Sequence, residues 1–196
     1  MHPPDGYQTN EMIDPVYSST AAELTARGED IDPVLERIEG CVKDISLGFG
    51  RWSEPDVRGP GLYFVVERES VEEFTAPMGS NRWPVEDCGS VLAETATFLG
   101  VAHRVGRSHD GAVVVHADGS IEEALVRVDQ LVSGDSGRTE ELPYGEWMGT
   151  RHMSALETSA RPEVLAVITL SEEDGRVTVF TDGTFEDAVA TSLTTG

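Results

Sequence analysis

The sequence predicts an α/β protein in which a mixed central β-sheet is flanked by helices. Residues 61–67 and 164–170 are short continuous apolar runs, which are typical of strands covered on both faces. An Asp-Gly pair at 118–119 lies between two apolar runs and predicts a hairpin. Residues 85–99 and 148–160 have helical patterns. Strands that alternate with helices and hairpins favour a mixed sheet.

The first sixty residues are expected to form an extension that is partly helical. Residues 1–20 mix Pro, Ser, Thr and Asn with few apolar positions, which indicates a loosely ordered end. Residues 21–49 have a helical pattern, and Asp32-Pro33 is a helix-start signal, with an N-cap followed by proline at the first position. We therefore divide the chain into an N-terminal extension, 1–60, and a domain, 61–190.

The elements after residue 60 follow from apolar runs and turn residues. Residues 77–84 are expected to form a loop, and the helix at 85–99 is expected to end at Gly100. In chain order, the remaining expected elements are strands at 111–115 and 124–128, a polar loop at 133–139, a helix at 148–160, a strand at 164–170, a turn at 173–175, a strand at 176–180 and a turn at 182–183.

The length and composition bound the class of protein. A chain of 196 residues with 39% hydrophobic and 26% charged residues is typical of one globular domain with added secondary structure, or of two small domains. No apolar run approaches the roughly 20 residues that a membrane span needs, and the start lacks a signal-peptide pattern. Cys41 and Cys88 form neither a disulfide framework nor a zinc spacing. We therefore expect a cytoplasmic protein that does not insert into a membrane.

The charge of the chain needs its own explanation. There are 36 acidic and 14 basic residues, which give a net charge of -22, and Lys43 is the only lysine. Such a composition is typical of proteins in molar salt, where the Debye length is about 3 Å. The alternative is an acidic surface that binds a cationic partner, but the acids are spread through the chain, which favours the halophilic interpretation. Both interpretations argue against nucleic-acid binding, which depends on clustered Lys and Arg.

Three segments at the edges of expected elements carry residues suited to chemistry. His109-Asp110 precedes a strand and offers an imidazole and a carboxylate together. Residues 149–152, Gly-Thr-Arg-His, open a helix, where free N–H groups and the helix dipole favour a phosphate. Ser171-Glu172 follows the strand at 164–170. Such groups, for a divalent cation and for phosphate, are what a nucleotide-transfer site needs.

Each segment also has a plain structural interpretation. A His-Asp or Asp-Gly pair in a loop is usually a turn, so Asp110 alone does not identify a catalytic group. Arg151 would often lie in solvent or pair with one of the many carboxylates, and 171–175 would often be a hairpin turn. A zinc site built from the three histidines His103, His109 and His152 has no recognised metalloprotease spacing.

Taken together, the order and spacing of these segments resemble a known family. Residues 61–185 resemble the diadenylate cyclase domain, the nucleotide-binding domain of the DNA integrity scanning protein. The family's His-Asp-Gly-Ala segment is matched by 109–112, its Gly-Thr-Arg-His-Arg motif by 149–153, and its apolar strand ending in Ser-Glu-Glu by 165–173. Residues 62–69 are also similar to the region that contains the family's Val-Ile-Glu-Arg-Glu. The acidic, lysine-poor composition is similar to that of a haloarchaeal version.

This resemblance implies an activity. The family condenses two ATP molecules into cyclic di-AMP, releases two pyrophosphates, and uses Mn²⁺ or Mg²⁺. Each domain would bind one ATP as substrate. Two copies would then meet face to face in a homodimer or higher homo-oligomer, so that each ribose 3′-hydroxyl attacks the α-phosphate of the other ATP.

The resemblance also implies residue roles. Asp110 would activate the 3′-hydroxyl, His109 and Asp110 would bind the metal, and Gly111 would let the backbone approach the nucleotide. Val128 would border the adenosine, and Ser171 with Glu172 would complete the metal and phosphate shell. The residues expected to be catalytic are Asp110, Gly111, Ala112, Arg151 and His152. Those expected to bind nucleotide are Gly111, Val128, Gly149, Thr150, Arg151, His152, Met153, Ser154, Ser171 and Glu172.

Met153 departs from the family pattern, because the family has an arginine there. A methionine cannot offer a guanidinium fork to phosphate. Either another arginine, such as Arg127, supplies the charge, or the activity is reduced. Two other functions therefore stay open: a regulator that binds ATP or cyclic di-AMP without turnover, and an acidic interaction module without a nucleotide site. The retained motif residues favour the enzyme.

Overall fold

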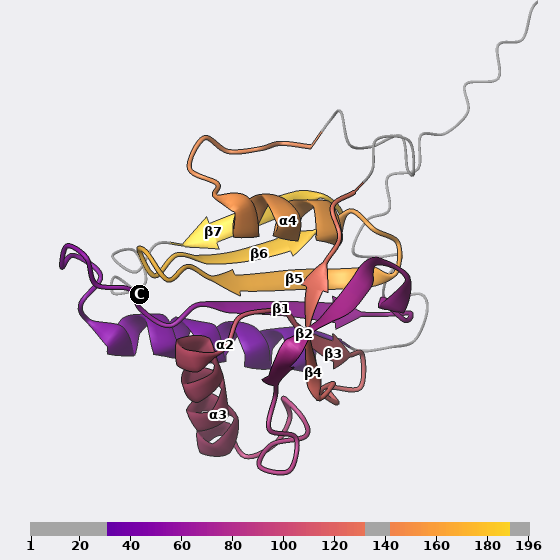
Figure 1. Cartoon of the computed structure of the whole chain (residues 1–196), viewed down its shortest axis with the longest axis horizontal. Helices are drawn as coiled ribbons and strands as arrows, with labels where there is room; N and C mark the ends of the chain where they lie inside the picture. Colours follow the sequence, from indigo (N-terminus) through magenta and orange to yellow (C-terminus); the bar gives the residue numbers. More distant parts are fainter. Residues whose placement is uncertain (1–30, 132–141, 189–196) are drawn as a thin grey trace, which may run out of the picture. The chain divides into compact units, whose positions relative to one another are not determined.

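The central feature of the fold is a five-stranded β-sheet (Figure 1). The computed structural model describes residues 31–131 and 142–188. In spatial order the strands are β3 (Val113–His116), β1 (Leu62–Glu67), β5 (Val164–Leu170), β6 (Val177–Thr181) and β7 (Thr184–Ala188). β1 and β3 are parallel, and the other neighbours are antiparallel. The predicted α/β class with a mixed sheet is confirmed.

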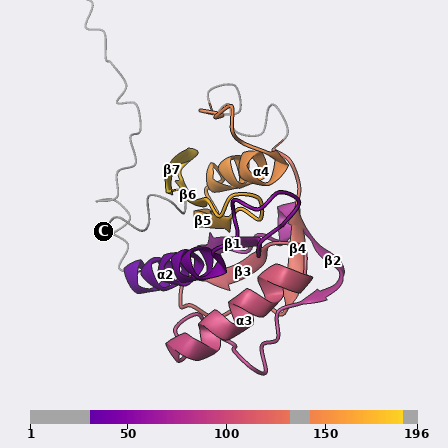
Figure 2. The same ribbon diagram turned by 90° about the vertical axis from the view of Figure 1, so that its left-hand side faces the viewer.

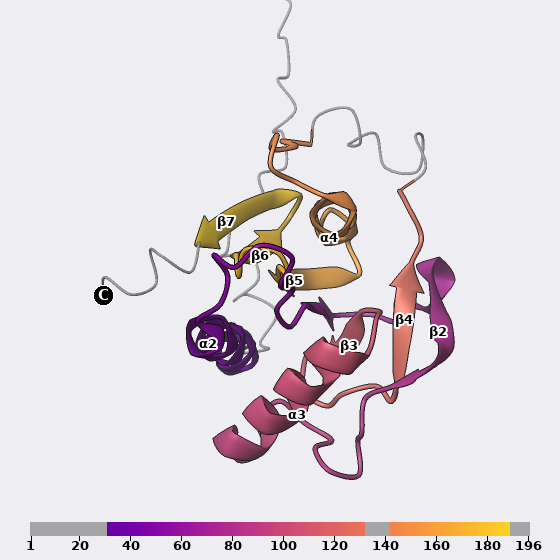
Figure 3. The ribbon, with the colours of Figure 1, turned by 60° about the vertical axis from the view of Figure 1, so that its left-hand side comes forward.

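Helices cover both faces of this sheet. α4 (Thr150–Ser159) lies on one face, and α2 (Asp32–Phe49) and α3 (Thr95–Ser108) lie on the other (Figures 2 and 3). β1 and β5 are therefore buried along their whole length, as their continuous apolar runs predict. Tyr63 belongs to the hydrophobic core beneath α4, whereas Phe64 packs against Phe98 of α3 with ring centroids 6.1 Å apart.

α2 begins one residue from where the sequence predicts its cap. Asp32 is its first helical residue, Pro33 lies in the first turn, and Ile31 occupies the N-cap position without a capping side-chain hydrogen bond. The buried side of α2 packs against β5, β6 and α3. α2 thus belongs to the same compact unit as the sheet. The division of the chain at residues 60 and 61 stays a prediction.

The helix expected at 85–99 is displaced toward the C-terminus. α3 starts at Thr95, where the Glu94 carboxylate accepts a hydrogen bond of 3.0 Å from the Thr97 N–H, and it continues through Gly100 to Ser108. The preceding segment forms turns, since the Trp83 indole donates a 2.7 Å hydrogen bond to the Cys88 carbonyl. The expectation that the helix ends at Gly100 is therefore wrong.

The loop expected at 77–84 is also wrong, because these residues largely belong to a strand. β2 (Thr75–Arg82) pairs antiparallel with β4 (Ala124–Val128) in a separate two-stranded sheet, with an irregularity between Pro77 and Arg82. Ala112 forms an isolated antiparallel bridge with Val126, which joins β4 to the chain entering β3. The strand at 124–128 and the turn at 118–119 are confirmed.

Two expectations fall on residues that the structure does not describe: the loosely ordered end at 1–20 and the polar loop at 133–139. The helical stretch predicted from residue 21 is likewise described only from residue 31 onward. Across 31–131 and 142–188, every helix is too short or too polar to cross a lipid bilayer.

Candidate functional site

The strand register gathers the three sequence segments at one end of the main sheet. Leu62 pairs with Leu170, so Gly61 lies opposite Ser171 when the register is continued by one residue. On the other side of β1, Phe64 pairs in parallel with Val113, three residues after Asp110. Because β3 and β5 flank β1, Asp110 and Ser171 lie at the same end of the sheet, on opposite sides of the start of β1.

Gly61 is the point at which these segments meet. Its N–H donates a 2.8 Å hydrogen bond to the carbonyl of Gly106 in α3. A Cβ at this position would lie 2.7 Å from Arg151 Nη1 and 3.2 Å from Glu172 Cβ. A larger residue at this position would displace the Arg151 guanidinium from its present place.

The His109-Asp110-Gly111 segment joins the end of α3 to β3. The His109 N–H donates a 2.9 Å hydrogen bond to the Val105 carbonyl, and its Nδ1 lies 2.8 Å from Ser108 Oγ, which leaves Nε2 available. Asp110 is exposed, and only its backbone carbonyl is bound, by Asn81 Nδ2 at 2.8 Å. Within the described residues its carboxylate has no partner.

Gly111 is required by the close approach of β4. It has a φ of 115°, and a Cβ there would lie 3.0 Å from Leu125 Cβ. Ala112 follows as a buried residue whose backbone exchanges hydrogen bonds of 2.7 and 2.9 Å with Val126. Val128, at the end of β4, is half-buried beside the core beneath α4.

The second segment forms the N-terminus of α4. Gly149 is the N-cap residue, with extended backbone (φ -83°, ψ -179°) and no side chain to cap the helix. The first-turn N–H groups are therefore free to bind an anion, and the helix dipole favours one. Thr150 is exposed at this end.

A cavity of about 310 Å³ lies between this helix start and the turn that joins β5 to β6. It unites the second and third segments, which are far apart in sequence. The residues that line it are Trp147, Gly149, Thr150, Arg151, His152, Ser171, Glu172, Glu173, Asp174 and Arg176. The first segment lies beside this cavity by register and does not line it.

His152 is the buried polar group of the cavity. Only 8% of its surface is exposed, and its Nε2 has no hydrogen-bond partner among the described residues. Burial lowers the pKa of His152, and the charges of Arg151 and Arg176 lower this pKa further, against the opposing effect of Asp174. The imidazole is therefore neutral near pH 7, with one ring nitrogen that a ligand would satisfy.

The turn after β5 is fixed by its own backbone and by one ion pair. The Ser171 N–H donates to the Arg176 carbonyl at 2.9 Å, and the Gly175 N–H donates to the Ser171 carbonyl at 3.2 Å. The Glu172 carboxylate pairs with Arg58 at 2.8 Å. Glu172 is thus held at the cavity edge with its charge already compensated.

Gly111 and Val128 do not line the cavity, and neither do three further residues that were expected to bind nucleotide or phosphate. Met153 is 38% exposed, and the Ser154 hydroxyl lies 3.4 Å from the Tyr63 hydroxyl on the core side of α4. Arg127, the suggested substitute for the missing arginine, is 70% exposed on β4 and 3.8 Å from Asp129. Their roles stay predictions that this geometry does not favour.

Trp147 and Arg176 line the cavity but were not predicted from the sequence as site residues. The Arg176 guanidinium lies 4.2 Å from the Trp147 ring centroid, and the same ring packs 4.9 Å from the His152 ring. The one available signal was that Arg176 directly follows the Ser-Glu-Glu segment and its glycine turn.

The residues expected to bind Mn²⁺ or Mg²⁺ are His109 and Asp110. No group of three or more His, Cys, Asp or Glu side chains gathers to bind a metal ion within the part of the chain that the structure describes. His109 and Asp110 are consecutive in sequence and both exposed, so this segment offers two donors. Two protein donors fit Mg²⁺ or Mn²⁺ at a nucleotide site, where water and substrate phosphates supply the remaining ligands.

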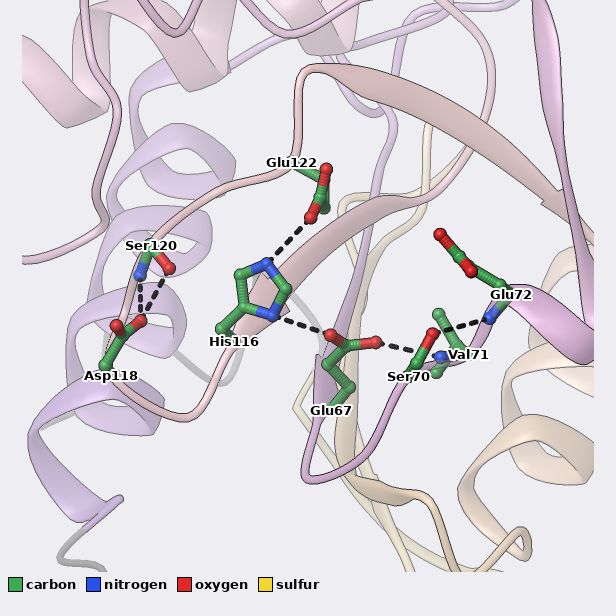
Figure 4. Close-up of polar contacts among 8 residues, drawn as sticks. All are labelled: Glu67, Ser70, Val71, Glu72, His116, Asp118, Ser120 and Glu122. Carbon is green, nitrogen blue, oxygen red and sulfur yellow. Dashed lines mark hydrogen bonds and ion pairs between the residues drawn. The ribbon is translucent and has the colours of Figure 1, made fainter.

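The opposite end of β1 and β3 carries a different polar cluster, formed by Glu67, His116 and Glu122 (Figure 4). His116 Nδ1 lies 2.6 Å from Glu67 Oε1, and His116 Nε2 lies 2.8 Å from Glu122 Oε1. Glu67 Oε2 accepts a 3.1 Å hydrogen bond from the Val71 N–H. The buried carboxylate of Glu67 therefore has partners at both oxygens.

Comparisons with known proteins point to the same class of protein as the motifs. Residues 95–185, just under half of the chain, match the DAC family model, described as DisA bacterial checkpoint controller nucleotide-binding. This segment runs from the first residue of α3 into β7 and contains all three motifs. No curated protein matches the chain.

Two solved structures are similar to the chain. One is DacA from Staphylococcus aureus, a double mutant, with 20% identity, a TM-score of 0.48, and coverage of 82% of this chain and 89% of that one. The other is a hypothetical membrane spanning protein from Bacillus cereus, with 20% identity, a TM-score of 0.48, and coverage of 78% and 61%.

Proposed function

We propose that this protein is a diadenylate cyclase that condenses two ATP into cyclic di-AMP and two pyrophosphates. The observation that carries the proposal is the register across β3, β1 and β5. It brings Asp110, whose carboxylate has no partner within the described residues, to the same end of the sheet as a cavity with arginines and a helix N-terminus. An activating carboxylate next to a phosphate cradle is what attack on an α-phosphate requires.

The cavity would bind the triphosphate. The first-turn N–H groups of α4 and the Arg151 guanidinium would donate to phosphate oxygens, and the His152 imidazole would contact the same ligand. His109 and Asp110 would hold Mn²⁺ or Mg²⁺, which supplies neutralisation of the triphosphate charge. Closing contacts of this kind order the flexible triphosphate and satisfy the buried imidazole.

Asp110 would accept the proton of the attacking ribose hydroxyl. The 3′-oxygen then forms a bond to the α-phosphorus of the other ATP, and the bond from that phosphorus to the bridging oxygen of pyrophosphate breaks. Two such steps give two phosphodiester bonds and two pyrophosphates. The exposure of Asp110 suits this role, because the hydroxyl it serves must also reach a second nucleotide.

The reaction would need two copies of the chain. One domain with one ATP presents a hydroxyl without a second α-phosphate, whereas two copies related by a twofold axis bring identical sites together. We therefore expect a homodimer or higher homo-oligomer with facing sites. ATP as substrate also argues for a cytoplasmic location.

A second candidate is a regulator that binds ATP or cyclic di-AMP without turnover. Met153 favours it, since this exposed residue offers no guanidinium where the family has one. A binding protein and a cyclase share the cavity and differ in whether product forms.

The deciding experiment is incubation of the full chain with ATP and Mn²⁺, or Mg²⁺, followed by mass spectrometry of the nucleotides. Cyclic di-AMP and pyrophosphate are expected, and Asp110→Asn should abolish them. Asp44→Asn, which removes an exposed carboxylate from α2, is the charge-matched control. ATP binding without product would favour the regulator, and no binding would remove both.

A further inference from the structure

The cavity receives guanidinium groups from two opposite walls. Arg151 reaches it from the start of α4, and Arg176 reaches it from the residue before β6. These are the two arginines among the lining residues, which also include the acids Glu172, Glu173 and Asp174. Because Glu172 is paired with Arg58, two acids of the lining stay uncompensated by it; Arg151 alone would leave an excess of negative charge around a polyphosphate, and Arg176 balances that excess.

We infer that Arg176 contacts the substrate phosphates and replaces the guanidinium that the family pattern places at Met153. This inference rests on the proposed function and deepens it by naming a substrate-binding residue. Met153 lies on the exposed side of α4 and does not line the cavity, whereas Arg176 does. The second guanidinium of the cavity therefore comes from Arg176, directly before β6, and not from a second arginine on α4.

Arg176 is held in place before any ligand arrives. Its side chain is only 18% exposed, its guanidinium lies 4.2 Å from the Trp147 ring centroid, and Nη1 pairs with Asp187 of β7. Nε lies 3.4 Å from Asp174 Oδ2, which is long for a charged hydrogen bond. Because the planar fork is already oriented, less entropy is lost when it binds phosphate.

The fork keeps donors for a ligand. Two of its nitrogens contact carboxylates, and Nη2 makes no hydrogen bond within the described residues. His152 lines the same cavity, and Trp147 packs on both residues. One aromatic ring therefore positions a cation and a neutral imidazole toward one ligand.

The other candidate arginines fit less well. Arg127 is 70% exposed and pairs with Asp129 on β4, outside the lining of the cavity. Arg58 is 71% exposed, and its guanidinium is bound to Glu172. Neither donates into the space that Arg151 enters.

The test measures binding of 3′-deoxy-ATP, which lacks the attacking hydroxyl and cannot be cyclised, by calorimetry with Mn²⁺ present. Arg176→Gln is expected to weaken this binding about tenfold or more, as loss of a charged hydrogen bond does. Binding of 3′-deoxyadenosine should not change, since it has no phosphate. The matched variant Arg127→Gln should bind both probes as the wild type does.

Two further variants separate a contact to phosphate from a structural role. Met153→Arg in the Arg176→Gln background should recover little of the lost affinity, because position 153 does not line the cavity. Asp187→Asn keeps an oxygen that can accept from Arg176 Nη1 but removes the negative charge that competes with phosphate, so it should strengthen 3′-deoxy-ATP binding; a purely structural ion pair would instead weaken it. The Asp187→Asn result stands even if Arg176→Gln does not fold.

The outcomes distinguish this inference from the proposed function. If wild type binds 3′-deoxy-ATP and Arg176→Gln binds it within twofold, Arg176 is not a phosphate ligand and the cyclase proposal stands. An equal loss for the nucleotide and the nucleoside would also overturn the inference, because that loss would not depend on phosphate. If wild type binds no 3′-deoxy-ATP, the proposed function and the inference both fail.

Discussion

The polar side chains at the two ends of the main sheet differ in whether they have hydrogen-bond partners. At the end of β1 near Glu67, His116 and two carboxylates satisfy one another (Figure 4). At the other end, the Asp110 carboxylate and His152 Nε2 have no partner within the described residues. Buried polar groups without partners cost stability. The other buried side-chain atoms without a partner among the described residues belong to Arg161, Thr169 and Thr178, none of which lines the 310 Å³ cavity, whereas His152 does. By these hydrogen-bond partners we call the Glu67 end the closed end and the Asp110 end the open end, although a cavity of about 410 Å³ also lies beside Glu67, His116 and Glu122.

Asp110→Asn is expected to have the largest effect. The amide keeps the size of the side chain and cannot accept the hydroxyl proton, so turnover should fall by about 10²- to 10⁴-fold. Affinity for 3′-deoxy-ATP should fall much less. His116→Gln, at the closed end, should leave kcat/KM within a few-fold. Equal losses in the two variants would remove the functional contrast between the ends.

Salt should act next most strongly, and mainly at the open end. With a net charge of -22, the chain repels a polyanionic substrate at low ionic strength. We expect ATP turnover and 3′-deoxy-ATP affinity to rise several-fold as KCl increases from about 0.1 M to about 1–2 M, because the Debye length falls from about 10 Å to about 3 Å or less. Neutral 3′-deoxyadenosine should show little change. Maximal activity in dilute buffer would exclude the halophilic interpretation.

The sequence predicted correctly the elements whose buried residues form a continuous apolar run. β1 and β5 are apolar at nearly every position, so their nature did not depend on distant contacts. β2 escaped because it is an edge strand with Pro77, Gly79 and exposed side chains, and its pairing with β4 defines it. The predicted start of α3 was too early because Val91, although buried, lies in a turn before the helix.

The candidate site divides in the same way. The three motifs were visible as residue patterns, and the sheet register then explains why they belong together. The sequence signal for Arg176 was only its place after the Ser-Glu-Glu segment and the glycine turn, since its orientation depends on Trp147 and on Asp187 in β7. Ser154 directly follows the matched segment 149–153, but the rotation of α4 turns its hydroxyl toward Tyr63.

At the closed end, loss of a partner should reduce stability. His116→Ala leaves the Glu67 Oε1 atom buried without its 2.6 Å donor. Because His116 is partly exposed, the expected decrease in the free energy of unfolding is about 1–2 kcal/mol. His103→Ala, at an exposed position of α3, is the control and should stay within about 0.5 kcal/mol of wild type. Urea denaturation measures both, and equal effects would mean that the cluster does not stabilise the fold.

The smallest expected effect is that His116 and His152 change the stability of the fold with pH in opposite directions. Burial alone would lower the pKa of His116, but hydrogen bonds and charges from Glu122 and Glu67 outweigh it and raise this pKa. Its stabilisation is therefore complete below the unfolded value of about 6.5 and is lost as pH rises through the raised folded value. At the open end, burial lowers the pKa of His152. Stability there is present above about pH 6.5 and is lost as pH falls through the lowered value.

Urea denaturation between about pH 5.5 and pH 8.5 can separate these two slopes, because glutamine does not titrate in this range. As pH rises, the stability advantage of wild type over His116→Gln should shrink. Over the same range, the stability of wild type relative to His152→Gln should increase. If both stability differences changed with pH in the same direction, the two histidines would not differ in the sign of their pKa shifts. The contrast between the two ends of the sheet would then have no support from stability.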